Sequence, residues 1–220
     1  MLLISQETYY IYLSFLSSFF ISGLLCFILD MKTSTNHIQT YVNKKKEITK
    51  SYLEALPVVL FNMFISIPII LIFFQYFHYI FKPFSFTQLL YLPFYLVVTD
   101  FAFYICHYSF HTTKLFNLYQ YHKIHHQFTR PISITSIYLH PVDLLFGNIV
   151  PLFTPIFIFP SSFIVLYLWT FFTIFETTYG AHSGIKNRGE DHDIHHKYFK
   201  YNYGSAFYLS DKLFKTYFSY

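Results

Sequence analysis

Long apolar stretches alternate with polar ones along the whole chain. Residues 9–29 (YYIYLSFLSSFFISGLLCFIL) are the first of them, a run of 21 residues without a charge. A helix of about 20 apolar residues crosses a hydrocarbon core about 30 Å thick, so this run predicts a membrane-spanning helix. A cleaved signal peptide is not expected, because it would begin with basic residues and only Glu7 precedes the run.

Two more apolar runs follow a polar stretch at residues 30–55. Residues 56–81 predict a second span, and residues 87–106 predict a third. Pro68 lies inside the second span and is expected to kink its helix without ending it, because neighbouring helices can satisfy the freed backbone groups.

The last apolar region is a pair of runs, residues 144–159 and 163–175, separated by Pro160, Ser161 and Ser162. The pair predicts a helical hairpin. Prolines at positions 151 and 155 would allow its first arm to dip into the membrane and return. The pattern as a whole predicts an all-α, polytopic membrane protein with about four spans.

Composition and charge agree with a membrane protein. Only 12% of the residues are charged and 54% are hydrophobic, against roughly 25% charged in a soluble domain. The net charge of +4 comes from dispersed lysines, which makes nucleic acid an unexpected partner. Cys26 and Cys106 both lie in apolar segments, so neither a disulfide framework nor a zinc finger is implied.

Charge placement also orients the chain. If residues 30–55 lie in the cytosol, the later crossings return residues 107–143 and 176–220, the second a polar tail, to the same side. All of the 15 lysines and arginines except Lys82 then face the cytosol, as the positive-inside rule requires. The histidine groups share that compartment, so we expect a cytosolic, histidine-rich helical cap.

Three groups of histidine stand in these polar stretches. They are the pair His107 and His111, the triplet His122, His125 and His126, and the triplet His192, His195 and His196. Positions i, i+3 and i+4 share one face of an α-helix, so each triplet is expected to aim its imidazoles at one point, as metal ligation requires. One such group alone is more often an accidental pattern of surface histidines, but three in one compartment indicate a metal site.

With His182 the number of candidate ligands is nine. Structural zinc takes four ligands and an octahedral metal six, so nine imidazoles suit two ions. Imidazole binds iron, zinc, copper and nickel, so the ligands alone do not name the metal. His37 and His78 stand apart and are left unassigned.

Asp100 is an ionisable residue inside the third span. Such a group is costly at membrane depth and needs a partner. It precedes His107 by seven residues, two helical turns, on the same face. We therefore expect its carboxylate to accept a hydrogen bond from the His107 ring and so orient a ligand, the alternative being a hydrogen bond that packs helices together.

The histidine groups, in their order along the chain and with their neighbouring residues, resemble the motifs of the membrane-bound fatty acid hydroxylase and sterol desaturase superfamily. The resemblance covers about residues 93–216. Its parts are residues 100–111 (DFAFYICHYSFH), 122–126 followed by Pro131, His140-Pro141 with Asp143, 176–184 (ETTYGAHSG), 191–196, 199–204 and 211–216. The part at 176–184 looks most like methylsterol oxidases. The resemblance divides the chain into N-terminal spans with a basic loop at residues 1–86 and a hydroxylase-like catalytic domain at residues 87–220.

The resemblance implies a non-haem di-iron centre held by the nine histidines. Such a centre uses dioxygen to hydroxylate or desaturate a membrane lipid, here with a sterol-type substrate favoured over a fatty acyl chain or sphingoid base. Asp100, His140, Asp143 and Glu176 would orient ligands. Asn202 and Tyr203 would cap or shape the site, or else serve the turn before Gly204.

An electron donor and a compartment also follow from the resemblance. The sequence contains no b-type cytochrome domain, flavin fingerprint or dinucleotide-binding loop, so electrons would come from an external reductase chain such as a b-type cytochrome. The protein would be a multi-pass protein of the endoplasmic reticulum if its source is eukaryotic, with the site facing the cytosol.

Departures from the family pattern leave the substrate open. They are Tyr108 after the first histidine, Asp143 for Glu, Asp191 for the first histidine of the third box, and Lys215 for Gly. The segment between Gly184 and the third box is also short, which predicts a shortened wall or lid. None of these departures removes a candidate ligand.

Two other functions compete with the oxygenase. A membrane zinc hydrolase would need a carboxylate base beside a triplet, and Asp193 is the only candidate in phase, without the H-E-x-x-H motif. A non-enzymatic metal-binding or transport protein would place ionisable groups within the spans, whereas the histidines lie at their ends.

Overall fold

The computed structural model describes residues 4–32, 35–113, 115–186, 188–205 and 207–219. Its helices are α1 (Gln6–Met31), α2 (Lys44–Phe61), α3 (Ile67–Phe74), α4 (Leu92–Thr112), α5 (Tyr119–His122), α6 (Pro141–Asp143), α7 (Val150–Ile158), α8 (Phe163–Phe175), α9 (Glu190–Tyr198) and α10 (Leu209–Phe214). Within these ranges the fold is all-helical, as expected.

Five helical segments are long and apolar enough to cross a membrane. They are Gln6–Met31, Lys44–Phe77, Phe86–Thr112, Pro141–Ile158 and Phe163–Ala181. The polytopic helical membrane protein expected from the sequence is therefore confirmed. Each arm of the hairpin is itself 18 or 19 residues long, so the last two spans do not need to be one re-entrant unit.

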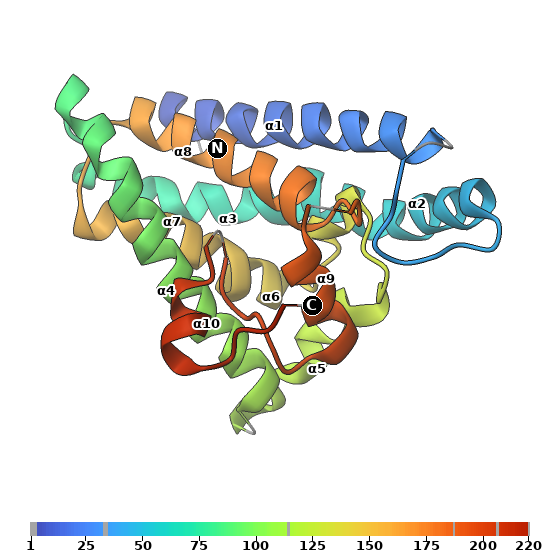
Figure 1. The fold of residues 1–220 in the computed structure, drawn as a ribbon. Coiled ribbons are helices and arrows are strands. Elements are labelled where there is room, and N and C mark those ends of the chain that lie inside the picture. The colour runs from blue at the N-terminus through green and yellow to red at the C-terminus, as the bar shows by residue number, and fades with distance from the viewer. Residues whose placement is uncertain (1–3, 33–34, 114, 187, 206, 220) are drawn as a thin grey trace.

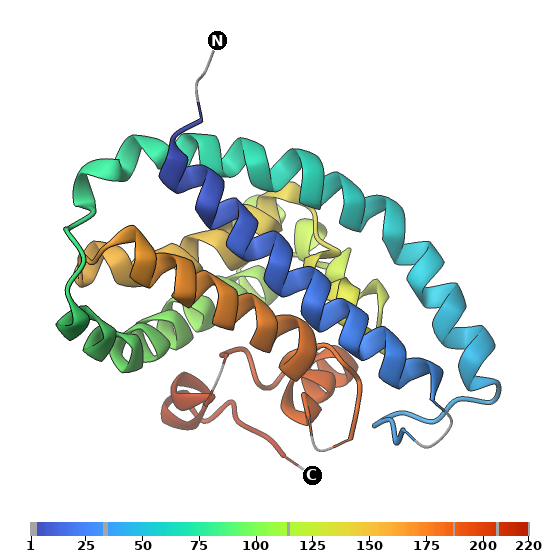
Figure 2. The same ribbon diagram turned by 90° about the horizontal axis from the view of Figure 1, so that it is seen from above.

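Helices α1 and α8 lie side by side, as both views show (Figures 1 and 2). Small polar residues on α1 allow the close approach, because their hydroxyls hydrogen-bond to the neighbouring backbone. Ser14 Oγ donates to the Tyr167 carbonyl at 2.6 Å, and Ser18 Oγ donates to the Phe171 carbonyl at 2.6 Å. The apolar faces of both helices then point into a shared core.

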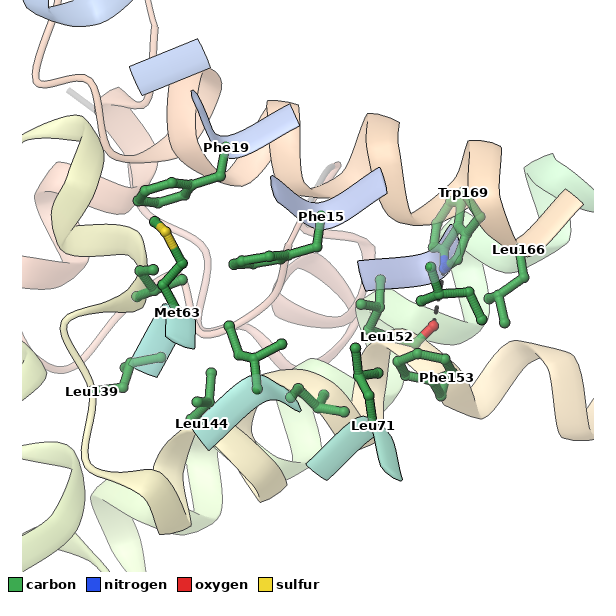
Figure 3. Close-up of a cluster of buried hydrophobic side chains, with 14 of the residues drawn as sticks. Phe15, Phe19, Met63, Leu71, Leu139, Leu144, Leu152, Phe153, Leu166 and Trp169 are labelled. Carbon is green, nitrogen blue, oxygen red and sulfur yellow. Dashed lines mark hydrogen bonds between the residues drawn. The ribbon is translucent and has the colours of Figure 1, made fainter. Parts of the chain in front are cut away.

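That core fills the space between α1, α3, α7 and α8 (Figure 3). Phe15 and Phe19 of α1 point toward Met63 and Leu144, and the Trp169 indole N–H donates to the Leu152 carbonyl at 2.9 Å. The indole is therefore buried without losing its hydrogen bond, which is the condition for placing Trp in a core.

Three spans contain a wide π-helical segment, namely Asn62–Ser66, Leu144–Ile149 and Glu176–Ala181. The first two lie just before Pro68 and Pro151. A proline lacks an N–H and its ring crowds the carbonyl four residues earlier, so a wider turn lets the helix continue. The helix through Pro68 continues, as expected.

The remaining helices form a cap at one end of the spans. In Figure 1, α9 and the C-terminus lie next to α5 near the end of α4, and α10 lies against the middle of α4. The loop after α1 joins this cap through a short bridge between His37 and Ile185. The cap holds the histidine groups that the sequence singled out.

Candidate metal centre

Nine histidines converge in the cap from four parts of the chain. His107 and His111 are one turn apart near the end of α4, and His182 follows the π-helical end of the last span. The two triplets come from α5 with the turn after it, and from α9. Their burial is nearly complete, and His111 is the most accessible.

The nine rings form two groups, each with its ligand atoms within 4.8 Å of one another. The five-histidine cluster consists of His107, His111, His122, His126 and His195. The four-histidine cluster consists of His125, His182, His192 and His196. The number of candidate ligands and their division between two sites agree with the expectation from the sequence.

The triplets do not each aim at one point, which corrects the sequence interpretation. In each triplet the residues at i and i+4 belong to one cluster and the residue at i+3 to the other. His122 and His126 face the five-histidine cluster, while His125 faces the four-histidine cluster. In α9 the assignment is reversed, because His195 crosses to the five-histidine cluster. The two clusters are thus tied together by both triplets.

The triplet that begins at His122 also departs from a single α-helix. Helix α5 ends at His122, and His125 and His126 lie in a 3₁₀ turn. This turn is tighter than an α-helix, as the Gln127 N–H donating to the Ile124 carbonyl at 3.2 Å shows. The change of winding after His122 accompanies the division of this triplet between the clusters.

Distances between the ring nitrogens suit a central cation. In the five-histidine cluster His126 Nε2 lies 2.9 Å from His122 Nε2, 3.1 Å from His111 Nε2 and 3.2 Å from His195 Nε2. Metal–nitrogen bonds of ~2.1 Å at right angles place adjacent nitrogens about 3.0 Å apart, and tetrahedral angles about 3.4 Å apart. One imidazole cannot donate to three neighbours at once, so the set is a better fit to a shared ion than to hydrogen bonds.

The four-histidine cluster has similar spacings. His192 Nε2 lies 3.1 Å from both His182 Nε2 and His196 Nε2, and His182 Nε2 lies 3.4 Å from His125 Nε2. Both clusters could therefore each hold one ion. Their nitrogen-only donor sets suit first-row transition metals and not calcium or magnesium, which prefer oxygen.

Hydrogen bonds at the other ring nitrogen fix which tautomer is present. His107 Nδ1 lies 2.8 Å from the Tyr203 carbonyl oxygen, and His195 Nδ1 lies 2.7 Å from that of Tyr201. His182 Nδ1 makes the same contact with the Thr177 carbonyl at 2.8 Å. Since a carbonyl only accepts, Nδ1 carries the proton and the Nε2 lone pair is free for a metal.

Burial favours the neutral form of six cap imidazoles by lowering their pKa. It lowers the pKa of His182 to about 4, and that of His125 well below the ordinary value, with neighbouring imidazoles adding to the His125 shift. The same cause lowers the pKa of His126, His192, His195 and His196. Neutral imidazole is the form that binds metals.

Asp143 makes the contact that the sequence led us to expect. Its Oδ2 lies 2.8 Å from His122 Nδ1, and both side chains are buried. The carboxylate sits against Gly147, where any Cβ would overlap it. Glycine at this position, within the π-helical segment, gives the carboxylate the space to reach the ring.

Asp100 does not orient His107 directly, which corrects the expectation. Its Oδ1 accepts from the Ser205 N–H at 2.9 Å, and its Oδ2 accepts from the Ser210 N–H at 2.8 Å and hydroxyl at 2.6 Å. Seven residues of helix return to the same face but rise about 10 Å, too far for a side-chain contact. Asp100 instead anchors the segment that presents the Tyr203 carbonyl to His107.

Asp211 secures the same segment from the other side. Its two oxygens accept from the Tyr203 N–H at 2.8 Å and the Gly204 N–H at 2.6 Å. No role for Asp211 was expected from its sequence, and no pattern reveals which backbone carbonyls will contact a histidine ring. Tyr201, Tyr203 and Thr177 were missed as acceptors for that reason.

His140 caps a helix, and its ring is placed for that task. Its Nδ1 accepts from the Val142 N–H at 3.1 Å at the start of α6, and its ring packs on Tyr121. Because α6 ends with Asp143, the cap helps to place that carboxylate. The expectation that His140 acts on a ligand is replaced by this indirect role.

Asn202 has the contacts of a turn residue. It lies in the left-handed region at φ 58°, and its amide donates to the carbonyls of Asp191 and Phe218, both at 2.8 Å. Its Oδ1 accepts from the Phe218 N–H at 2.9 Å. These bonds join the start of α9 to the C-terminal segment, so the contacts favour turn chemistry over a role at the reacting atoms.

Glu176 lines a cavity that begins at the histidines. Among the described residues its carboxylate makes no hydrogen bond to an imidazole, so the expected contact with a ligand is not seen. The cavity holds about 520 Å³ and continues between the spans, where Phe15, Leu71 and Phe153 form part of its wall. Along the last span it extends from Thr170 to Ala181, about 17 Å.

Known proteins similar to this chain were found by sequence. The family model described as fatty acid hydroxylase matches residues 92–216. A very-long-chain aldehyde decarbonylase of Oryza sativa subsp. japonica is 30% identical over 90% of this chain and 80% of that protein. A methylsterol monooxygenase of Arabidopsis thaliana is 28% identical over 91% of this chain and 81% of that protein.

A Delta(7)-sterol 5(6)-desaturase of Aspergillus fumigatus is 34% identical over 60% of this chain and 38% of that protein. No solved structure matches the chain. The family match covers more than half of the chain, and the rice relative is matched over most of its length. The chain therefore belongs to the fatty acid hydroxylase family of oxidoreductase enzymes.

Proposed function

We propose that this protein is a membrane-bound oxygenase that hydroxylates or desaturates a lipid at two iron ions, one in each histidine cluster. The observation that carries the proposal is the pair of adjacent all-imidazole clusters at the end of an apolar cavity between membrane helices. A purely metal-binding protein would have no use for a cavity with apolar walls at the centre.

The number and spacing of ligands in the five-histidine cluster favour iron over zinc. Five imidazoles exceed the four ligands of a tetrahedral zinc site, and their spacings are near those of right-angle coordination. The carboxylate base that a zinc hydrolase would need beside a histidine triplet is also engaged in another contact. Asp193 accepts from Gln39 Nε2 at 3.0 Å and 3.1 Å, and it belongs to neither histidine cluster. We therefore retain zinc hydrolysis only as the outcome that would contradict the proposal.

When bound, the iron pair would supply the activation of dioxygen and the electron transfer that C–H oxidation requires. The protein's own part is positioning. Asp143 and the Tyr203 carbonyl hold the Nδ1 protons of His122 and His107, so that both Nε2 atoms face the five-histidine cluster. The buried cap keeps imidazoles neutral, and the apolar cavity walls hold a lipid and exclude water.

A sterol-type substrate is the first candidate. The cavity volume of about 520 Å³ is within the ~300–1,000 Å³ typical of small-molecule sites, which suits one sterol. The likeness to a methylsterol monooxygenase extends over nine-tenths of the chain. A long-chain aldehyde is the second candidate, because the likeness to an aldehyde decarbonylase is equally extensive.

Electrons would come from an external carrier such as a b-type cytochrome, since the sequence has no haem, flavin or dinucleotide motif of its own. The placement of lysines and arginines supports a site on the cytosolic side, and in a eukaryotic cell the endoplasmic reticulum is the proposed membrane.

The test uses membranes that contain the iron-loaded protein, a reductase system and either 4-methylsterol or a long-chain aldehyde. We expect a hydroxylated or desaturated product that requires dioxygen, and oxygen-18 from labelled dioxygen in any new hydroxyl group. The His125→Ala variant, which removes one ligand of the four-histidine cluster, should be folded and inactive. A product that forms without dioxygen, or equally with His125→Ala, would contradict the proposal.

A further inference from the structure

Near the end of the polar region that we placed in the cytosol, the chain carries an exposed apolar face. We call residues 205–214, which include α10, the tail. The exposed side chains are Phe207, Leu209, Leu213 and Phe214, and Phe207 and Leu213 are 59% and 63% exposed. They lie on α10 and just before it, and Lys212 and Lys215 flank them. Four large apolar side chains on so short a stretch need a partner that is itself apolar.

The tail is held at the depth of a membrane span. Asp100 of α4 binds Ser205 and Ser210 at 2.6–2.9 Å, so these residues lie at the level of Asp100. Figure 1 shows α10 against α4, and the Phe214 ring lies 5.1 Å from Tyr104 and 6.4 Å from Phe101 of that helix.

That level falls at the edge of the hydrocarbon core. The helical segment Phe86–Thr112 has 27 residues, of which Phe86–Tyr91 form a 3₁₀ helix, and is about 43 Å long, some 13 Å longer than the core. With the whole overhang on the histidine side, the boundary falls about nine residues before Thr112, near Phe103. Phe101 lies just before this boundary and Tyr104 just after it, so Phe214 packs on the part of α4 that crosses the edge of the core.

The apolar face of the tail also continues the lipid-facing side of α4. Phe94, Val97 and Ile105 are exposed along one stripe of that helix, and the Phe101 ring in the same stripe touches Phe214. Because the apolar face of the tail is continuous with the lipid-facing side of α4 at the same depth, it is expected to contact lipid as well. Lysines at its edge can extend to the headgroups and complement anionic lipids.

We propose that the tail from Phe207 to Phe214 is seated in the headgroup–acyl boundary of the bilayer, with a lipid surface as its partner. The inference does not depend on the reaction proposed above. Ser205 and Tyr208 of the tail and Thr99 and Phe103 of α4 line the same cavity. The seated tail therefore makes one wall of the cavity at the lipid boundary, where a bilayer lipid can approach the histidines from the side.

The experiment places a fluorescent reporter on the tail of the full chain in vesicles. Trp169 is the chain's one tryptophan and is buried, so Trp169→Phe provides a dark background for Leu213→Trp. Phe116→Trp is the matched control, because Phe116 is 76% exposed beyond the end of α4. Quenching is measured with brominated acyl chains and with aqueous iodide.

We expect brominated lipid to quench the Leu213→Trp reporter at least twofold more than the Phe116→Trp reporter, and iodide to give the opposite order. Equal quenching of the two reporters by brominated lipid would overturn the proposal. A Leu213→Trp reporter that neither quencher affects, as it would be if protein covered it, would also overturn the proposal. If Trp169→Phe does not fold, the same comparison with Trp169 retained decides the matter, since its emission is common to all variants.

Discussion

Replacing Asp143 with Asn should weaken metal binding in the five-histidine cluster specifically. The substitution keeps the size of the side chain and removes its charge. The wild-type carboxylate lies 2.8 Å from His122 Nδ1, with the two side chains 1% and 4% exposed. Without the carboxylate, the proton of the His122 ring is no longer firmly held at Nδ1 and the ring is less firmly oriented.

The size of the effect follows from two separate estimates. A buried hydrogen bond to a charged group contributes ~1.5–3 kcal/mol. Loss of a residue that orients a metal-bound histidine typically lowers metal affinity 10–100-fold, or ~1.4–2.8 kcal/mol. We therefore expect Asp143→Asn to release the ion of this cluster at a 10–100-fold lower chelator concentration, while the four-histidine cluster keeps its ion.

The assay is metal content per chain after dialysis against increasing chelator. Asp193→Asn is the matched control, because Asp193 is equally buried and adjacent to a histidine in sequence but binds Gln39. Its metal affinity should change less than about threefold. Equal metal retention by the two variants would refute the argument that Asp143 acts through His122.

Three further predictions concern the same centre. His126→Ala and His125→Ala, although adjacent, should each lose a different one of two spectroscopically distinct irons, and loss of the same iron from both would contradict the division into clusters. Gly147→Ala should lower metal content because its Cβ displaces a carboxylate, whereas Gly23→Ala, whose Cβ meets its nearest neighbour at 3.8 Å, should leave it unchanged. The metal-free protein should lose thermal stability as the pH falls from about 6.5 toward 4. In this range the unfolded chain takes up protons, but burial lowers the pKa of His182 to about 4 and keeps its imidazole neutral. Bound metal should remove most of this pH dependence, and a melting temperature of the metal-free protein that does not change with pH would contradict the neutral-imidazole argument.

The spans and the candidate ligands could be predicted from sequence because both depend on local patterns. Charge-free runs such as residues 9–29 identify membrane helices by length alone. The i, i+3, i+4 spacing identified both triplets as candidate metal ligands, and the structure places all nine candidate histidines in two clusters. Asp143 was expected to orient a ligand only because His140-Pro141 with Asp143 resembles an element of the family, and no local pattern marks it.

The predictions that the structure corrects depended on distances along and between helices and on backbone groups, which no sequence motif reveals. Seven residues of helix suggested that Asp100 faces His107, but the rise of about 10 Å leaves the carboxylate for Ser205 and Ser210 instead. The division of each triplet between two clusters depends on how α5 and α9 face each other. The Tyr203 carbonyl that holds His107 is a backbone group, which every residue possesses and no motif marks.

Mössbauer spectroscopy combined with metal analysis tests whether the two clusters hold two iron ions. The protein would be expressed with enriched iron and purified in detergent without chelator. We expect about two irons per chain, coupled to each other, in two distinct nitrogen-rich environments, one for each of the five- and four-histidine clusters. Two zinc ions and no iron, or a single metal ion per chain, would contradict this expectation.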